Sequence, residues 1–243
     1  MKKIVLAAVA IVLLALPPSV VAQDYTMYEV QRVRALPGTT VDIGVAMVEH
    51  NQKFHAEAPY SASVFYMVTG PYSGQYQWIM GPTTFTQMDA RPADASHGSD
   101  WSTRVLAHAE VYETEYWRQI DDLSYTPDAM PEGTRPISLV RRFTVTDNAL
   151  FIKVQRQIME VFRAAGSPNP RIMYQRQFLS ADPWGWAIVI SYPNFAALDE
   201  PGFDFQAEFR ALHGDTAWNT FNEELDRAVA ARDDVIRQLI TGA

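Results

Sequence analysis

Hydrophobic and polar positions along the chain follow the same order twice. Residues 27–54 combine an extended segment, a turn and a helical pattern, and residues 137–162 repeat that order. Two further extended segments follow each of them, ending at Asp89 in the first half and at Asp199 in the second. The pattern therefore predicts an internally duplicated chain.

A His-Gly pair ahead of a tryptophan occurs near the end of each half, as "SHGSDW" from Ser96 and "LHGDTAW" from Leu212. Apolar residues at helical spacing then predict a long helix in both halves. The apolar positions of these two helices are Trp101, Val105, His108 and Tyr112, and Trp218, Phe221, Leu225, Val229 and Ile236. A fourth strand has no fixed place, although "DDLSYTP" from Asp121 is a candidate in the first half.

The duplication divides the chain into a first repeat at 25–125, a linker at 126–136 and a second repeat at 137–241. The linker is marked by its proline content. A sheet that carries helices on one face must bury its other face, and packing the two sheets together achieves this. We therefore expect two sheets face to face, with helices outside.

This order of elements, present twice, resembles the ferredoxin-like dimeric α/β barrel superfamily. That superfamily includes the antibiotic-biosynthesis monooxygenases, the NIPSNAP-like proteins and the haem-using chlorite dismutase relatives. The resemblance implies an α+β fold of two tandem ferredoxin-like repeats, whose antiparallel sheets pack as an α/β barrel in a single-chain pseudo-dimer. It also implies that the barrel interior binds or transforms small molecules.

The N-terminus and the composition limit where the protein is expected to act and which partners it is expected to have. Residues 1–22 have the layout of a secretory signal cleaved near Ala22, which predicts a periplasmic or secreted protein with no membrane partner after cleavage; the alternative is a retained N-terminal anchor. The chain has no cysteine, so disulfides and thiolate metal sites are excluded. Removing Lys2 and Lys3 with the signal takes the net charge from -8 to -10, which argues against nucleic acid. We expect a small-molecule partner and a monomeric pseudo-dimer or a weak homo-oligomer.

Arginines are the candidate ligand-binding residues of the barrel interior. Strand alternation places Arg142 opposite the apolar face of its strand, and aligning the two repeats puts Arg32 at the same position. Arg176 lies in the middle of a later strand and is expected to join them. Guanidinium groups bind carboxylate or phosphate well. The alternative is that the arginines pair with internal carboxylates such as Glu29, or lie in water at the barrel rims.

Aromatic side chains from neighbouring strands are expected to complete a pocket. The candidates are Tyr66, Tyr174, Trp78, Trp184 and Trp186. The alternative is that they are ordinary core residues.

His97 and His213 are the candidate catalytic residues, because both repeats have them. A neutral imidazole can serve as a general base, a haem ligand or a hydrogen-bond donor. The alternative is structural: Gly98 and Gly214 permit a sharp turn, and the histidines only close it. In that alternative the helix N-caps are Ser99 or Asp100 in the first repeat and Asp215 or Thr216 in the second.

The other histidines do not form a metal-binding pattern. His50 falls on the buried face of the first helix and reads as structural, and His55 lies five residues on, too far to share that face. No metal site is therefore expected. Cofactor-free and haem-degrading members of the superfamily combine a polar first-strand residue with Trp and His, for which Arg32, Trp78 and His97 are loose counterparts. An arginine cannot act as a base there.

Three functions remain open from the sequence. The first is an exported protein that binds a small aromatic or anionic molecule between its sheets, with no cofactor required. The second is a monooxygenase-type enzyme, cofactor-independent or using haem, which is the cofactor that the resemblance leaves open. The third is a structural or partner-binding exported protein.

Overall fold

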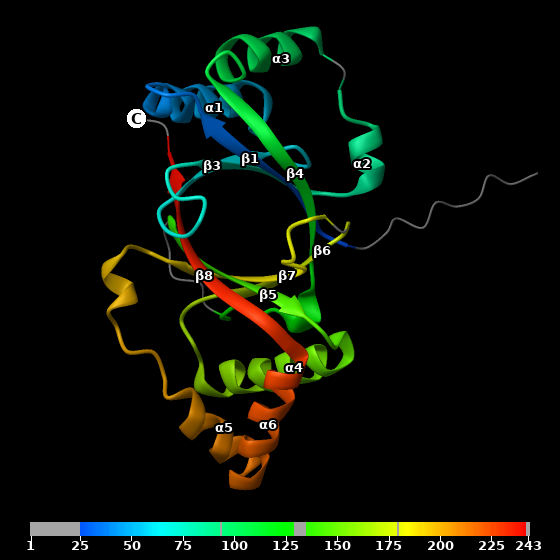
Figure 1. Ribbon diagram of the computed structural model, residues 1–243, viewed down its shortest axis with the longest axis vertical. Coiled ribbons are helices and arrows are strands. Elements are labelled where there is room, and N and C mark those ends of the chain that lie inside the picture. Colours follow the sequence, from blue (N-terminus) through cyan, green and yellow to red (C-terminus); the bar gives the residue numbers. More distant parts are fainter. Residues whose placement is uncertain (1–24, 93, 129–134, 179, 242–243) are drawn as a thin grey trace, which may run out of the picture.

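The structure is a computed structural model of the chain (Figure 1). It describes residues 25–92, 94–128, 135–178 and 180–241. The predicted secretory signal lies outside the described residues, as does most of the predicted linker. No helix in the described ranges is both long and apolar enough to span a bilayer.

Each half of the chain supplies four strands with helices between them. The elements of the first half are β1 (Met27–Ala35), α1 (Thr40–Phe54), β2 (Ala62–Met67), β3 (Tyr76–Thr83), α2 (Phe85–Asp89), α3 (Ala95–Asp100), the π-helical turn η1 (Trp101–Val105), β4 (Ala109–Gln119) and the 3₁₀ turn η2 (Asp121–Leu123). The elements of the second half are β5 (Ile137–Val145), α4 (Asn148–Ala165), β6 (Arg171–Arg176), β7 (Trp186–Tyr192), the 3₁₀ turn η3 (Ala196–Leu198), α5 (Phe205–His213), α6 (Asp215–Ala228) and β8 (Val229–Ile240).

The eight strands close into one antiparallel barrel in the order β1-β3-β2-β8-β5-β7-β6-β4. Two junctions join the repeats: β2 pairs with β8 from Val64 to Met67, and β4 pairs with β6 from Trp117 to Gln119. Closure leaves no free edge among the described strands. The expected α+β fold of two ferredoxin-like repeats packed as an α/β barrel is confirmed.

The helices cover the outside of the barrel at its two opposite sides (Figure 1). Helices α1 and α3 lie against the sheet of the first repeat, where Ile43, Met47 and Trp78 share one buried cluster. Helix α4 lies against the sheet of the second repeat and is backed by α5 and α6. A separate apolar cluster that includes Val30, Val140 and Val235 lines the barrel interior. The sheets are therefore buried on both faces.

Local chemistry explains where the longest helix begins and ends. The Asp147 side chain caps the start of α4 by accepting a hydrogen bond from the Leu150 backbone N–H at 3.0 Å. Gly166 ends the helix with φ of 60°, a left-handed conformation that glycine adopts without strain. Between these ends, Phe151 packs on the sheet and Val154 packs with the aromatic rings of α5 and α6, and neither has exposed surface.

The expected long helices are corrected by the structure. The helical segments stop at Val105 and Ala228, and the fourth strands β4 and β8 follow. Every residue of β1 pairs with β4 and every residue of β5 pairs with β8, so the strands satisfy backbone groups that a longer helix would leave at an open edge. The "DDLSYTP" candidate forms only the turn η2 and one isolated bridge from Tyr125.

Truncating the aromatic anchor of α4 tests this packing. Phe151 is fully buried and lies 5.2 Å, between ring centroids, from both Phe143 and Trp186. We expect Phe151→Ala to lower the free energy of unfolding by about 3–5 kcal/mol in urea denaturation. The matched control Phe195→Ala removes a ring that is 44% exposed and should change it by less than about 0.5 kcal/mol. Equal losses in the two variants would contradict the packing described for α4.

Candidate functional site

A cavity of about 290 Å³ lies between the two sheets. Strand alternation decides what lines it, because successive side chains point to opposite faces. Val30 and Arg32 line it from β1, and Ser138, Val140 and Arg142 line it from β5. The cavity volume lies just below the range of about 300–1,000 Å³ found for small-molecule sites.

Three carboxylates hold Arg32 and Arg176 inside the barrel. Arg32 Nε lies 3.0 Å from Glu113, and its Nη2 lies 3.5 Å from both Glu115 and Asp182. Arg176 Nη2 lies 2.9 Å from Glu113 and 2.5 Å from Glu115. Burial raises the pKa of Glu115, an effect that Arg32 and Arg176 oppose. These five residues form a charge network with more acids than bases.

Arg142 belongs to a second ion pair of the same kind. Its guanidinium donates two hydrogen bonds to Asp233 across the β5–β8 pairing, at 2.9 and 2.5 Å. The guanidinium also lies 4.9 Å from the Trp184 ring and 5.6 Å from the Tyr72 ring. Asp233 is therefore a strand residue whose carboxylate pairs with a buried guanidinium.

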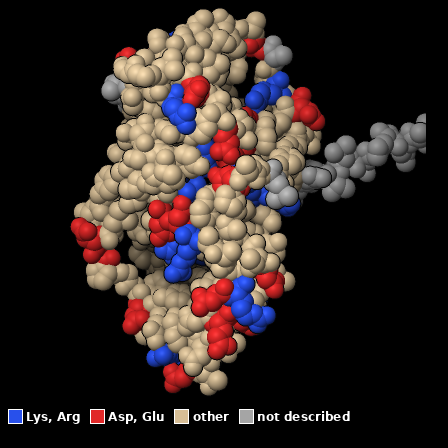
Figure 2. Space-filling model, in the orientation of Figure 1, with Lys and Arg blue, Asp and Glu red and all other residues tan. Residues whose placement is uncertain are grey.

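The three arginines thus pair with internal carboxylates, which is one of the two alternatives that the sequence leaves open. The expected partner Glu29 is not among these carboxylates, because it pairs with Arg91 at 2.5 Å. Acidic and basic side chains also lie next to one another on the surface viewed in Figure 2. Because internal carboxylates already compensate the charges of Arg32, Arg142 and Arg176, the case for anion binding by these three arginines is weaker.

Arg237 on β8 differs from these three arginines in its hydrogen-bond and ion-pair partners. It also lines the cavity, next to Ser138 in the β5–β8 register. Its Nη1 donates to Gln77 Oε1 at 2.9 Å, and its guanidinium lies 4.3 Å from the Phe65 ring. Its Nε is buried with no hydrogen-bond partner, and no carboxylate of the described chain pairs with it. Burial lowers the pKa of Arg237 to about 10, so the side chain remains charged at neutral pH.

Arg171 shows what a fully satisfied buried arginine looks like in this fold. It faces α4, is 3% exposed and also has its pKa lowered by burial, to about 9. Its guanidinium, however, donates to Leu123 O, Gln155 Oε1 and Met159 Sδ. Arg237 has one such acceptor and open space beside it.

Aromatic and hydroxyl groups complete the cavity near Arg237. The rings of Tyr28 and Tyr174 pack edge to face at 5.7 Å, and both side chains line the cavity. Burial raises the pKa of both hydroxyls, so both are neutral donors at ordinary pH. Arg135 also lines the cavity, but its guanidinium donates to Asn169 and Ser191. The group around Arg237 can therefore hold an acidic ligand with one flat face.

The other predicted aromatic residues lie outside the cavity. Trp78 and Tyr66 pack under the helices of the first repeat, and the Trp78 indole donates to Asn51 at 2.7 Å. Trp186 packs against α4 and donates to Asn148 at 2.9 Å. These residues fall on the opposite parity of their strands from the cavity-lining positions. The expectation that they line the pocket is corrected, and of the expected aromatic residues only Tyr174 does so.

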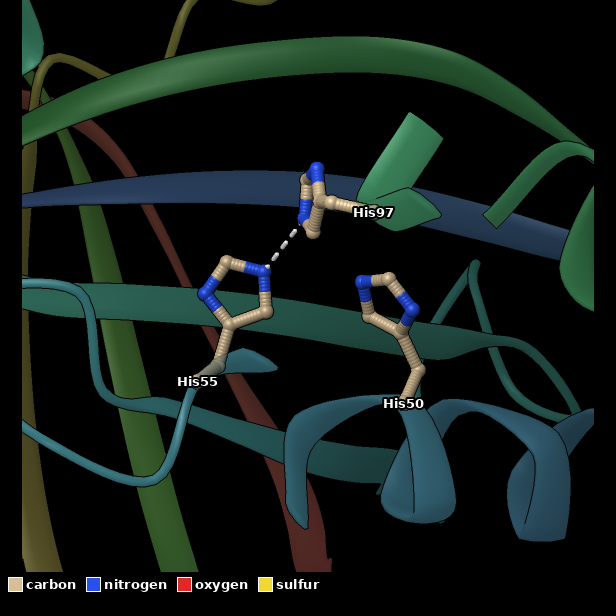
Figure 3. Close-up of side chains that lie close together, drawn as sticks. All are labelled: His50, His55 and His97. Atoms are coloured by element: carbon tan, nitrogen blue, oxygen red, sulfur yellow. Dashed lines mark hydrogen bonds between the residues drawn. The ribbon is translucent and has the colours of Figure 1, made fainter. Parts of the chain in front are cut away.

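The two candidate catalytic histidines also lie outside the barrel. His97 is on α3, on the outer side of the first sheet, against His50 and His55 (Figure 3). His213 ends α5, where its ring lies 4.5 Å from Phe209 and 3.4 Å from the Glu160 carboxylate. The two histidines therefore have different neighbours, although each is followed by a glycine and a tryptophan in the sequence.

The turn expected around these histidines forms in one repeat only, and the expected N-caps are wrong in both. Gly214 has φ of 86° and separates α5 from α6, as a turn-forming glycine should, but it is itself the N-cap of α6 in place of Asp215 or Thr216. Gly98 instead lies inside α3, whose N-cap is Asp94 and not Ser99 or Asp100. Asp100 accepts a hydrogen bond from His50.

Two groups of side chains have the composition of a metal site. Ring nitrogens of His50, His55 and His97 lie within 4.8 Å of one another, and so do carboxylate oxygens of Glu113, Glu115 and Asp182. Arg32 and Arg176 already pair with the carboxylates, so no cation is needed there. In the histidine group, His50 Nε2 has no hydrogen-bond partner among the described residues, while His55 Nε2 and His97 Nε2 are hydrogen-bonded to each other.

No family model matches the chain, and no curated protein matches it in sequence. Solved structures match in shape. A "putative monooxygenase" from Lactobacillus acidophilus aligns at 14% identity over 90% of this chain and 98% of its own, with a TM-score of 0.53. Another from Fusobacterium nucleatum aligns at 9% identity over 89% and 93%, with a TM-score of 0.55. A chlorite dismutase from Candidatus Nitrospira defluvii aligns at 10% identity over 89% and 92%, with a TM-score of 0.52.

The chain has the dimeric α/β barrel fold. At these identities the likeness establishes the shared architecture and leaves the chemistry to the residues of this chain. Haem, the cofactor that the resemblance implies, does not fit the barrel cavity: about 290 Å³ is small for a macrocycle, and no described histidine lines the space. The rings of His50, Phe54 and His55 pack against His97 at 4.9–5.2 Å between centroids, so a macrocycle does not fit beside this histidine either.

Removing one carboxylate from the Arg32 network tests whether the carboxylates stabilise the protein by compensating the charges of the buried arginines. Glu115→Ala should lower the free energy of unfolding by about 3–5 kcal/mol, because it leaves buried arginines short of a partner. The control Glu110→Ala breaks a pair with Arg34 in which both side chains are 52% exposed, and should cost less than about 1 kcal/mol. Urea denaturation of both variants measures the two losses in the free energy of unfolding. If Glu115→Ala loses no more than Glu110→Ala, the network is not needed for stability.

Proposed function

We propose that this protein binds a small aromatic carboxylate in the cavity between its two sheets, with Arg237 as the residue that recognises the anion. The observation that carries the proposal is the Arg237 guanidinium, which is enclosed in the cavity wall with a partnerless Nε and no carboxylate partner in the described chain. A buried charge without a counterion is costly, and a bound carboxylate would supply one.

The neighbouring groups support an aromatic acid. A guanidinium donates to a carboxylate through two parallel hydrogen bonds, and such charge-assisted bonds each contribute about 1.5–3 kcal/mol. Tyr28 and Tyr174 offer ring edges and hydroxyl donors within the same cavity, and Val140 and Val189 offer apolar contact. The cavity volume suits one ring with a short substituent.

The internal ion pairs favour binding of an anion at Arg237 over binding at the other arginines. Arg32, Arg142 and Arg176 are each held by a carboxylate at 3.0 Å or less. An anion placed beside them would meet Glu113 or Asp233 as well, and would be repelled. The charge pattern therefore directs an anionic ligand toward Arg237.

Replacing Arg237 tests the proposal with benzoate as the probe. We expect isothermal titration calorimetry to show benzoate binding to the full chain, weakened about 10–100-fold in Arg237→Met because the charge-assisted hydrogen bonds are lost. The neutral isostere benzamide should bind weakly to both proteins. The control Arg141→Met removes an arginine that pairs with Asp234 on the other face of the sheet, and should bind benzoate normally. Unchanged benzoate binding in Arg237→Met would refute the assignment.

A second candidate function is monooxygenase-type catalysis on a ligand of the same cavity. It is favoured by the fold likeness to proteins named as monooxygenases. Against it, the expected base His97 lies outside the cavity. Oxygen uptake in the presence of quinols distinguishes the two functions: turnover that falls in Tyr174→Phe would favour the enzyme, and no uptake would favour binding alone.

We also propose that the chain is exported, as residues 1–22 predict. Intact-mass measurement of the chain recovered from the periplasm or culture medium of its bacterial host should find an N-terminus at Gln23. A chain that retains Met1 in the cytoplasm would contradict this part of the proposal.

A further inference from the structure

Three histidines that are distant in sequence meet on the outer side of the first sheet. His50 is on α1, His55 immediately follows that helix, and His97 comes from α3 (Figure 3). His50 is 1% exposed and His55 is 5% exposed, while His97 is half-buried. One ring nitrogen of each lies within 4.8 Å of the others.

Hydrogen bonds to the Nδ1 atoms fix the tautomers of the two buried rings. His55 Nδ1 lies 2.7 Å from the Tyr60 carbonyl oxygen, which can only accept, so this nitrogen carries the proton. His50 Nδ1 lies 2.9 Å from an Asp100 carboxylate oxygen and donates in the same way. In a neutral ring the other nitrogen, Nε2, then has a free lone pair.

Both of these lone pairs face the same small space. His50 Nε2 is buried and has no hydrogen-bond partner among the described residues, and it points toward the other two rings in Figure 3. His55 Nε2 accepts a hydrogen bond from His97 Nε2–H at 2.9 Å, and an ion bound between them would replace this proton and leave His97 protonated at Nδ1. Two imidazole nitrogens bound to one tetrahedral zinc ion lie about 3.3 Å apart, given zinc-nitrogen bonds of about 2.0–2.1 Å. Small ring movements would therefore bring the three nitrogens to coordination distance.

The surroundings hold the ligand rings in place. The rings of Trp78 and Trp101 pack against the histidines at 5.0 and 4.9 Å. A carboxylate and a backbone carbonyl on the non-coordinating nitrogens are the usual outer partners of metal-binding histidines.

We propose that His50, His55 and His97 bind one divalent transition-metal ion through their Nε2 atoms, with zinc as the preferred ion. Imidazole ligands suit zinc, and three protein ligands leave a fourth position for water. Asp100 and the Tyr60 carbonyl act as positioning groups. His97 is the ligand nearest solvent and provides the path by which the ion enters.

The second repeat shows that the fold does not require this cluster. Aligning Phe54 with Phe162 places Ile158 at the position of His50 and Arg163 at that of His55. His213, which matches His97 in sequence, lies near Glu160 instead. The same α/β architecture therefore forms without three converging histidines, so their presence in the first repeat calls for a separate explanation.

The experiment uses the full chain without a histidine tag, stripped of metal with a chelator and then dialysed. Titration with Zn²⁺ against a chromophoric chelator should show one tight site per chain, and Co²⁺ should give the visible absorption of a four-coordinate ion. Thermal denaturation should show a higher Tm with Zn²⁺ than without it. We expect His97→Ala to weaken Zn²⁺ binding more than 100-fold, since loss of a ligand should exceed the 10–100-fold effect of an outer partner.

Matched controls separate this site from surface binding and from misfolding. His108→Ala and His213→Ala remove histidines outside the cluster and should bind Zn²⁺ like the unmodified chain. His97→Ala should keep the metal-free Tm, because its ring is half-buried, and lose only the increase caused by Zn²⁺. Asp100→Asn should weaken binding about 10–100-fold while the Co²⁺ spectrum keeps its four-coordinate form.

Absence of stoichiometric uptake by the unmodified chain would overturn the proposal. So would equal Zn²⁺ affinity in His97→Ala, or equal losses in His97→Ala and the two control variants. A folded His97→Ala chain with normal metal-free stability and no Zn²⁺-dependent rise in Tm would support it. None of these readouts depends on ligand binding in the barrel cavity.

Discussion

Burial of the two inner sheet faces against each other is the constraint on which the rest of the structure depends. Once the strands close into a barrel, every charged side chain on an inner face must find a counterion or hydrogen-bond acceptor within the barrel. Glu113, Glu115 and Asp182 meet this demand for Arg32 and Arg176, and Asp233 meets it for Arg142. Arg237 has neither a carboxylate partner among the described residues nor an acceptor for its Nε, whereas Arg135, which also lacks a carboxylate, donates to Asn169, Ser191 and Pro168; this difference defines the candidate ligand site.

The same architecture carries different chemistry on the outer sides of its two sheets. Beneath the helices of the second repeat, an aromatic cluster around Phe209 and Phe221 fills the space between α4, α5 and α6. Beneath the helices of the first repeat, His50, His55 and His97 occupy part of the corresponding layer. Duplication thus leaves each repeat free to diverge where the barrel itself is not affected.

Sequence patterns predict the barrel well because its elements repeat and because strand alternation has a period of two. Counting from Val30 and Val140 places Arg32 and Arg142 on the inner face, where the structure has them. Arg237 escapes this reasoning because the apolar residues from Trp218 onward also fit a helix, which hides the start of β8. The repeated "RQI" and "RQL" ends of the two halves are the signal that could have marked both fourth strands.

The histidine cluster lies beyond sequence reasoning for a different reason. His55 falls past the end of α1, and His97 lies 42 residues further along, so no local spacing connects them. Only the packing of α3 against the end of α1 brings these rings together. Tertiary contacts of this kind leave no periodic trace in the chain.

The central claim is that Arg237 is the anion-recognising residue of the barrel. It is tested most directly by the ¹⁵N resonance of the Arg237 side-chain Nε–H group, followed by NMR during addition of benzoate. The account predicts a saturable shift of this resonance, with the Arg141 Nε–H resonance unchanged because Arg141 pairs with Asp234 on the outer face. An Arg237 resonance that does not move at saturating benzoate, or that moves no more than that of Arg141, would contradict the account.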